Sequence, residues 1–207
     1  LQKVNDLMNS RAKPSQCDEW LAQEFDLDRD TWKDWKTGMS QAGQDRYLAE
    51  KIFKRKESGV FIDIGAYDGE TYSSSWLLEK CYRWKGICFE PGDINNLIHK
   101  RDCIVYRGGA SNGETGKCQI EFMEDGSVQN NICFNLQAVE AFHGVTEVDL
   151  LIINRRGHNL KSLDRIAHNV KVIAVEDGNP HYLVAELQTL GFKLAKQVGV
   201  HQIYTKE

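Results

Sequence analysis

The sequence lacks the features that several large protein classes require. Only three of 207 residues are proline and 27% are charged, which excludes fibrous and disordered chains. No apolar run approaches the roughly 20 residues of a membrane span. The N-terminal residues show neither an initiator Met nor the basic-then-apolar layout of a signal peptide, so we expect a cytoplasmic location. The missing Met is also consistent with one domain of a longer polypeptide.

The sequence also has no excess of positively charged residues. The formal net charge of −4 supplies no field for sequence-independent binding of nucleic acid, so we expect no nucleic acid partner. The six cysteines form no C-x-x-C pair and have no His at metal-ligand spacing. Because free Cys is often buried, we predict reduced, buried thiols.

The chain divides at about residue 38. Residues 1–38 hold three of the five tryptophans in a dense mixture of charges, and Ser15 with Asp18 could cap a helix. We predict a helical N-terminal appendage over 1–38, which is more often a structural lid than a substrate-binding element. The remaining residues, 39–207, form the main domain.

Strand-like and helix-like segments alternate in that domain. Nearly continuous β-branched runs suit strands that are buried on both faces of a parallel sheet. The alternation predicts an α/β fold, Rossmann-like and doubly wound, with a final hairpin at the sheet edge. Strands are expected at 59–65, 86–91, 103–106, 117–124, 148–154, 170–176, 192–199 and 201–206, and helices at 73–84, 93–101, 130–142, 157–168 and 180–190.

The candidate ligand site follows the first two core strands. Ligands in open α/β sheets bind beyond the carboxyl ends of the strands. The first strand leads into an acidic glycine turn in which Gly65 and Gly69 allow close approach of the backbone to a ligand, and the second ends at Glu90, which can accept hydrogen bonds from ribose hydroxyls. The turn lacks the G-x-G-x-x-G triplet, which favours a nucleoside over the dinucleotide of a nicotinamide-dependent oxidoreductase.

Three strings of the sequence resemble the FkbM-type family of S-adenosylmethionine-dependent O-methyltransferases. They are SQAGQD at 40–45, VFIDIGAYDGETYSSSWLLEK at 60–80 and WKGICFEP at 84–91. The resemblance covers about residues 39–207 and implies a class I methyltransferase sheet of seven strands, mostly parallel. It also implies S-adenosylmethionine as cofactor and a sugar or glycan as acceptor, with a small metabolite as the alternative.

The resemblance also implies site residues. Asp63 and the turn that follows would surround the methionine moiety, and Glu90 would bind the ribose. The full set of expected cofactor-binding residues is Gln41, Gln44, Asp63, Gly65, Ala66, Tyr67, Gly69, Ser73, Glu90 and Pro91.

The match fails after the fourth core strand. The family usually has Asp-x-Glu-Gly-His-Glu there, whereas residues 154–159 read NRRGHN. Three acids of the pattern are lost and two arginines are gained, and this change from negative to positive charge would spoil a metal site. We therefore expect either a metal-independent enzyme or a non-catalytic domain that retains the fold.

Methyl transfer to a hydroxyl needs a group that accepts the hydroxyl proton. Asp68 is the first candidate base, although its carboxylate could instead cap the next helix. His158 is the second candidate, and Asn154 could orient the acceptor. Tyr67 and Tyr72 are the expected aromatic wall for a sugar ring. We assign no chemistry to the remaining histidines, which include His143, His168, His181 and His201.

Overall fold

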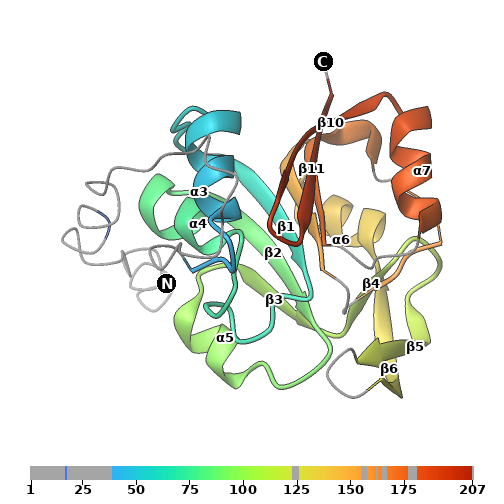
Figure 1. Cartoon of the computed structure of the whole chain (residues 1–207). Coiled ribbons are helices and arrows are strands. Elements are labelled where there is room, and N and C mark those ends of the chain that lie inside the picture. The colour runs from blue at the N-terminus through green and yellow to red at the C-terminus, as the bar shows by residue number, and fades with distance from the viewer. Residues whose placement is uncertain are drawn as a thin grey trace.

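A seven-stranded sheet forms the centre of the protein (Figure 1). The computed structural model describes residues 17, 39–122, 126–154, 158–161, 163–164, 167–176 and 181–206, so the appendage expected over 1–38 lies outside the described residues except for Cys17. The strand order is β10-β11-β9-β7-β1-β2-β3. The strands are β1 (Val60–Ile64), β2 (Lys85–Glu90), β3 (Ile104–Arg107), β7 (Val148–Ile153), β9 (Val170–Glu176), β10 (Phe192–Val198) and β11 (His201–Lys206).

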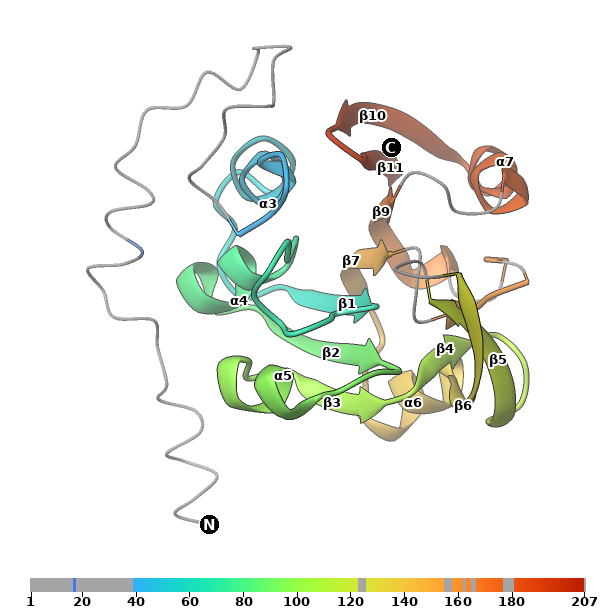
Figure 2. The ribbon, with the colours of Figure 1, turned by 60° about the horizontal axis from the view of Figure 1, so that its bottom comes forward.

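The pairing of these strands confirms the fold class. β1 is parallel to β2 and β7, while β3 and β9 extend the parallel sheet on either side. β11 alone runs antiparallel between β9 and β10, so the final hairpin inserts one reversed strand. Figure 2 shows β1, β2 and β3 side by side with their carboxyl ends at the same edge. Such a sheet is of the class I methyltransferase type.

Helices cover both faces of the sheet, which explains why its central strands β1 and β7 are mostly apolar. One face packs against α3 (Gln44–Tyr47), the π-helical turn η2 (Leu48–Ile52), α4 (Trp76–Tyr82) and α5 (Asn95–Lys100). The other face packs against α6 (Leu136–Phe142) and α7 (His181–Thr189). In the part of the chain that the structure describes, no helix is long and apolar enough to cross a membrane.

A second sheet of four strands, in the order β5-β6-β4-β8, lies beyond the end of β3 (Figure 2). It corrects two expectations. The helix expected at 130–142 begins only at Leu136, because the preceding residues pair with β5 in an antiparallel hairpin. The helix expected at 157–168 is wrong at its start, because β8 pairs in parallel with β4. The strands are β4 (Gly109–Ser111), β5 (Gly116–Phe122), β6 (Ser127–Asn135) and β8 (His158–Asn159), and a short 3₁₀ helix, η3 (Ala167–Asn169), precedes β9.

All six cysteines are paired, so the prediction of reduced thiols is wrong. The disulfides are Cys17–Cys81, Cys88–Cys103 and Cys118–Cys133. Each joins segments that only the fold brings together, which is why spacing in the sequence did not indicate them. Disulfides persist mainly in oxidising compartments, and these three therefore oppose the expected cytoplasmic location.

Candidate functional site

A turn with left-handed backbone conformations follows β1, and we call residues 65–72 the glycine turn. Gly65 and Tyr67 have φ values of 82° and 54°. The N–H groups of Gly65 and Ala66 both donate to the carbonyl of Phe89 on β2, at 2.8 and 3.1 Å. The turn is thereby fixed across the carboxyl ends of β1 and β2, where ligands of open α/β sheets bind.

Gly69 is needed for packing. Its φ is 82°, and a Cβ there would lie 2.6 Å from Arg101 Cγ and 2.7 Å from Leu97 Cδ1. A side chain at this position would therefore push the glycine turn away from α5. The sequence interpretation gave Gly69 a role in admitting a ligand, whereas the structure gives it this contact.

Glu90 ends β2 and is only 1% exposed. Its Oε2 accepts a hydrogen bond from Tyr67 N at 2.7 Å, and its Oε1 accepts one from Gly92 N at 2.8 Å. The carboxylate thus connects the glycine turn to the turn after β2.

Asp63 lies beneath the glycine turn and is buried. Its Oδ2 accepts a hydrogen bond from Ser75 Oγ at 2.5 Å, and its Oδ1 accepts one from Asn154 Nδ2 at 3.2 Å. Burial raises the pKa of the Asp63 carboxyl, and the charge of Arg101 and these two hydrogen bonds offset only part of that rise. Asp63 therefore supports the turn from within the protein.

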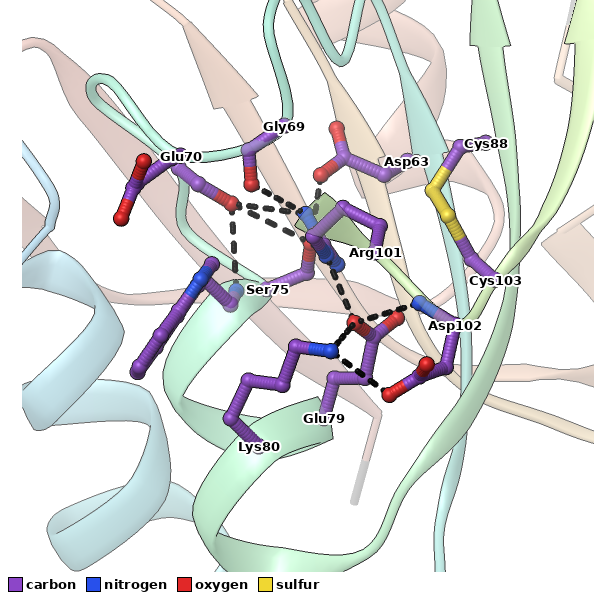
Figure 3. Close-up of polar contacts among 12 residues, drawn as sticks. Asp63, Gly69, Glu70, Ser75, Glu79, Lys80, Cys88, Arg101, Asp102 and Cys103 are labelled. Atoms are coloured by element: carbon purple, nitrogen blue, oxygen red, sulfur yellow. Dashed lines mark hydrogen bonds and ion pairs between the residues drawn. A yellow bond between two sulfur atoms is a disulfide. The ribbon is translucent and has the colours of Figure 1, made fainter. Parts of the chain in front are cut away.

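Arg101 organises the other end of the turn (Figure 3). Its Nε donates to Glu79 Oε1 at 2.8 Å, and its side chain has no exposed surface. Its Nη1 donates to the Gly69 carbonyl at 2.9 Å and to Ser73 Oγ at 3.1 Å, and its Nη2 donates to Ser75 Oγ at 2.8 Å. One guanidinium thus joins the glycine turn to α4.

No pattern in the sequence indicates a role for Arg101, because arginine side chains are mostly exposed in proteins. Its place in the fold is fixed from both sides. Arg101 N donates to Leu97 O at 3.0 Å, and Cys103, two residues later, is bonded to Cys88 of β2. The first contact is a helical hydrogen bond within the helix expected at 93–101, whereas no local pattern indicates the disulfide.

Asp68, the first candidate base, is held by four hydrogen bonds. Its Oδ1 accepts from Glu70 N and Thr71 N, and its Oδ2 accepts from Thr71 Oγ1 and from Lys100 Nζ at 3.3 Å. Partial burial opposes ionisation of Asp68, but these hydrogen bonds outweigh it and keep its pKa below the ordinary value. Three of these hydrogen bonds lie within the glycine turn and none caps the next helix, because α4 begins at Trp76 and the N–H of Trp76 donates to Ser73 Oγ. A carboxylate held in this way suits a general base poorly.

Asn154 directly follows β7 and faces β1. Its backbone N–H donates to Ile64 O at 3.1 Å, and its Nδ2 donates to Asp63 Oδ1 and to the Gly65 carbonyl. Its Oδ1 lies 3.2 Å from His201 Nε2. The amide expected to orient an acceptor therefore holds the start of the glycine turn.

The other expected cofactor residues lie around this centre. Ser73 Oγ accepts from Trp76 N at 3.1 Å at the start of α4. The Pro91 carbonyl accepts from Asn131 Nδ2 at 3.1 Å. Gln41 is exposed, whereas Gln44 is completely buried and reaches His201.

Two parts of the expected site cannot be placed. The side chain of the candidate base His158 and residues 155–157 lie outside the described part of the structure. Among the residues that the structure does describe, no group of three His, Cys, Asp or Glu side chains could hold a metal ion.

Comparison with known proteins finds similarity only among solved structures. No protein-family model and no curated protein matches this sequence. The fibrillarin pre-rRNA processing protein of Methanococcus jannaschii matches over 73% of this chain and 68% of its own, with 14% identity and a TM-score of 0.42. A Pyrococcus horikoshii protein named "putative RNA methyltransferase" matches over 94% of this chain and 99% of its own, with 16% identity and a TM-score of 0.41.

These matches correct one expectation about partners. Both names concern RNA, which contradicts the exclusion of nucleic acid partners from the net charge of −4. The FkbM-type family remains a resemblance carried by the motifs alone, while the fold itself is established by the strand order.

Proposed function

We propose that the protein is a methyltransferase that moves a methyl group from S-adenosylmethionine to a hydroxyl of a sugar. The observation that carries the proposal is the buried Glu90 carboxylate, which ends β2 and binds the N–H group of Tyr67 in the glycine turn. In an open α/β sheet, an acid at this position is suited to bind the two hydroxyls of a ribose. The missing dinucleotide triplet favours a single nucleoside.

The residues present fit this cofactor. Glu90 would bind the ribose, and the glycine turn would lie along the methionine moiety, supported by Asp63 and Asn154 from below. When bound, the cofactor supplies an electrophilic methyl group on its sulfonium. The protein's part is to hold the acceptor oxygen in line with that methyl group and to receive the hydroxyl proton.

The acceptor class rests on aromatic exposure beside the turn. Tyr67 and Tyr72 are 45% and 60% exposed, and both have left-handed backbone conformations within the glycine turn. Flat aromatic faces with a polar edge suit a sugar ring. Because the Asp68 carboxylate is engaged within the glycine turn, His158 is the proposed base, and its unperturbed pKa near 6.5 suits proton transfer.

We further propose that the protein works in an oxidising compartment. The three disulfides account for all six cysteines, and such pairing is rare in reducing compartments. Labelling of unfolded protein purified without reductant should then find no free thiol. Six reactive thiols in protein from its natural compartment would contradict this part of the proposal.

Methyl transfer is tested directly with isotope-labelled S-adenosylmethionine. The acceptor panel contains hexosides, deoxyhexosides, small phenols and short RNAs, and mass spectrometry follows the label. The proposal expects labelled sugar hydroxyls together with release of S-adenosylhomocysteine. Label confined to phenols would contradict the acceptor class, and label on a nucleobase would contradict O-methylation.

A non-catalytic binding domain is the second candidate function. It is favoured by the engagement of Asp68 and Asn154, two of the three expected catalytic residues, in contacts that hold the turn. Binding of S-adenosylmethionine without release of S-adenosylhomocysteine over the whole panel would favour this candidate. Turnover with any acceptor would exclude it.

A further inference from the structure

A buried row of hydrogen bonds joins four separate parts of the fold at the edge of the candidate site. Gln44 Nε2 lies 3.2 Å from His201 Nδ1, and His201 Nε2 lies 3.2 Å from Asn154 Oδ1. Asn154 Nδ2 lies 3.2 Å from Asp63 Oδ1 and 3.1 Å from the Gly65 carbonyl. The row therefore runs from α3 through β11 and the end of β7 to the end of β1.

The direction of every hydrogen bond in this row is determined. The Gly65 carbonyl can only accept, so the amino group of Asn154 faces it and the amide oxygen faces His201. His201 must then donate from Nε2. Gln44 Oε1 already accepts from Ala42 N at 3.0 Å, so Gln44 Nε2 donates to His201 Nδ1. Only a neutral imidazole with its proton on Nε2 satisfies both neighbours.

The surroundings maintain that state. His201 is 3% exposed, and burial lowers its pKa to about 4. Two acids lie nearby, Glu176 of β9 opposite His201 in the strand register and Asp63 one residue further along the row, and their negative charge favours the imidazolium. Burial outweighs this attraction. The β10–β11 turn packs closely on the segment before α3, because a Cβ at Gly199 would lie 2.3 Å from Ala42 Cβ.

We propose that His201 is a positioning residue of the cofactor site. Its Nε2–H fixes the amide of Asn154, and Asn154 fixes the Asp63 carboxylate and the Gly65 carbonyl, and with them the start of the glycine turn. The inference rests on the proposed function for the identity of the ligand. It gives a role to a histidine on the last strand, distant in sequence from every motif.

Matched substitutions separate this role from simple packing. His201→Phe keeps a ring and removes both hydrogen bonds, whereas His201→Gln keeps a donor that reaches Asn154. We expect the Kd for S-adenosylmethionine to rise about tenfold in His201→Phe and to stay within about threefold in His201→Gln. His168→Phe, a change at an exposed histidine, should leave the Kd unchanged.

Nuclear magnetic resonance of the unliganded protein supplies a readout that needs no ligand. Imidazole nitrogen shifts of His201 should show the Nε2–H tautomer at pH 7. The side-chain amide protons of Asn154 should exchange slowly in the wild type and in His201→Gln, and much faster in His201→Phe. A charged His201, or the Nδ1–H tautomer, would overturn the proposal even if His201→Phe did not fold.

The outcomes also separate this inference from the proposed function. A wild-type chain that does not bind S-adenosylmethionine would end the proposed function, and the tautomer and amide exchange would still decide whether His201 positions Asn154. A folded His201→Phe variant with wild-type Kd and unchanged Asn154 exchange would overturn the inference alone.

Discussion

The two sides of the glycine turn are held by different chemistry. On one side, the Arg101 guanidinium binds the Glu79 carboxylate and the Gly69 carbonyl. On the other, His201 and Asn154 hold the turn through neutral groups. Both sides end on Asp63, through Ser75 and through Asn154.

The two kinds of chemistry should contribute differently to the glycine turn. A buried ion pair that loses one partner leaves an uncompensated charge, and this costs several kcal/mol. A neutral hydrogen bond contributes about 1 kcal/mol net. We therefore expect the charged side to decide whether the turn forms, and the neutral side to decide how accurately it is placed.

Breaking the charged side should have the largest effect. Arg101→Met removes the 2.8 Å charged hydrogen bond to the buried Glu79 carboxylate and leaves it, among the described residues, only Lys80 Nζ at 3.7 Å and Asp102 N at 3.1 Å. We expect the free energy of unfolding to fall by about 3 to 5 kcal/mol in urea titrations. The double variant Arg101→Met/Glu79→Gln should recover a large part of this loss. A loss below about 1 kcal/mol for the single variant would show that the ion pair does not hold the turn.

Removal of the Cys88–Cys103 disulfide, which lies beside Arg101, should have the second-largest effect. Cys88 and Cys103 are 15 residues apart in the chain, and the entropy of closing such a loop is worth about 3 kcal/mol. Cys88→Ala/Cys103→Ala should therefore lower the free energy of unfolding by about this amount. The Cys118–Cys133 disulfide closes a loop of the same length within the β5–β6 hairpin. We therefore expect Cys118→Ala/Cys133→Ala to lower stability without weakening binding of S-adenosylmethionine, and Cys88→Ala/Cys103→Ala to weaken both.

Lowering the pH should destabilise the side of the glycine turn that His201 and Asn154 hold. The folded pKa of His201, about 4, lies below its unfolded value of 6.5, so its contribution to stability is complete above pH 6.5 and is lost as pH falls toward 4. Between pH 7 and pH 5 the wild type should lose about 2 kcal/mol more than His201→Gln.

The contribution of Glu140 to stability has the opposite pH dependence, so it must be separated from that of His201. Burial raises the pKa of Glu140 from 4.5 to about 7, so its contribution is complete below pH 4.5 and is lost as pH rises through 7. Glu140 is present in both proteins, and its effect cancels when wild type and His201→Gln are compared at the same pH. Parallel pH profiles for the two would contradict the burial of a neutral His201.

A substitution at Asp68 should have the smallest effect on stability and turnover. Asp68→Asn weakens hydrogen bonds within the glycine turn and a partly exposed ion pair with Lys100, and we expect the two together to contribute about 1 kcal/mol. We expect turnover within about threefold of the wild type, since the structure assigns the carboxylate to the turn. A loss of 10²-fold or more would restore Asp68 as the base.

Sequence predicted the central sheet because its strands carry their own signal. Nearly continuous apolar runs such as β7 (Val148–Ile153) are typical of strands that are buried on both faces. The hairpin strand β6 was predicted as helix because its pairing with β5 and the Cys118–Cys133 bond join residues that no local pattern connects.

The same distinction between local signals and distant contacts applies to the residues of the candidate site. Glu90 and the glycine turn stand at strand ends, where sequence position implies location. Arg101 and His201 reach the site only through burial against distant elements, so their roles appear only in the folded chain.

The central claim is that Glu90 and the glycine turn form a site for S-adenosylmethionine, and calorimetric titration tests it most directly. We predict saturable binding of one cofactor per chain to the wild type, at least about tenfold weaker in Glu90→Ala, with Glu70→Ala on the same turn within about threefold. Equal affinity of a folded Glu90→Ala variant, or no binding to the wild type, would contradict the account.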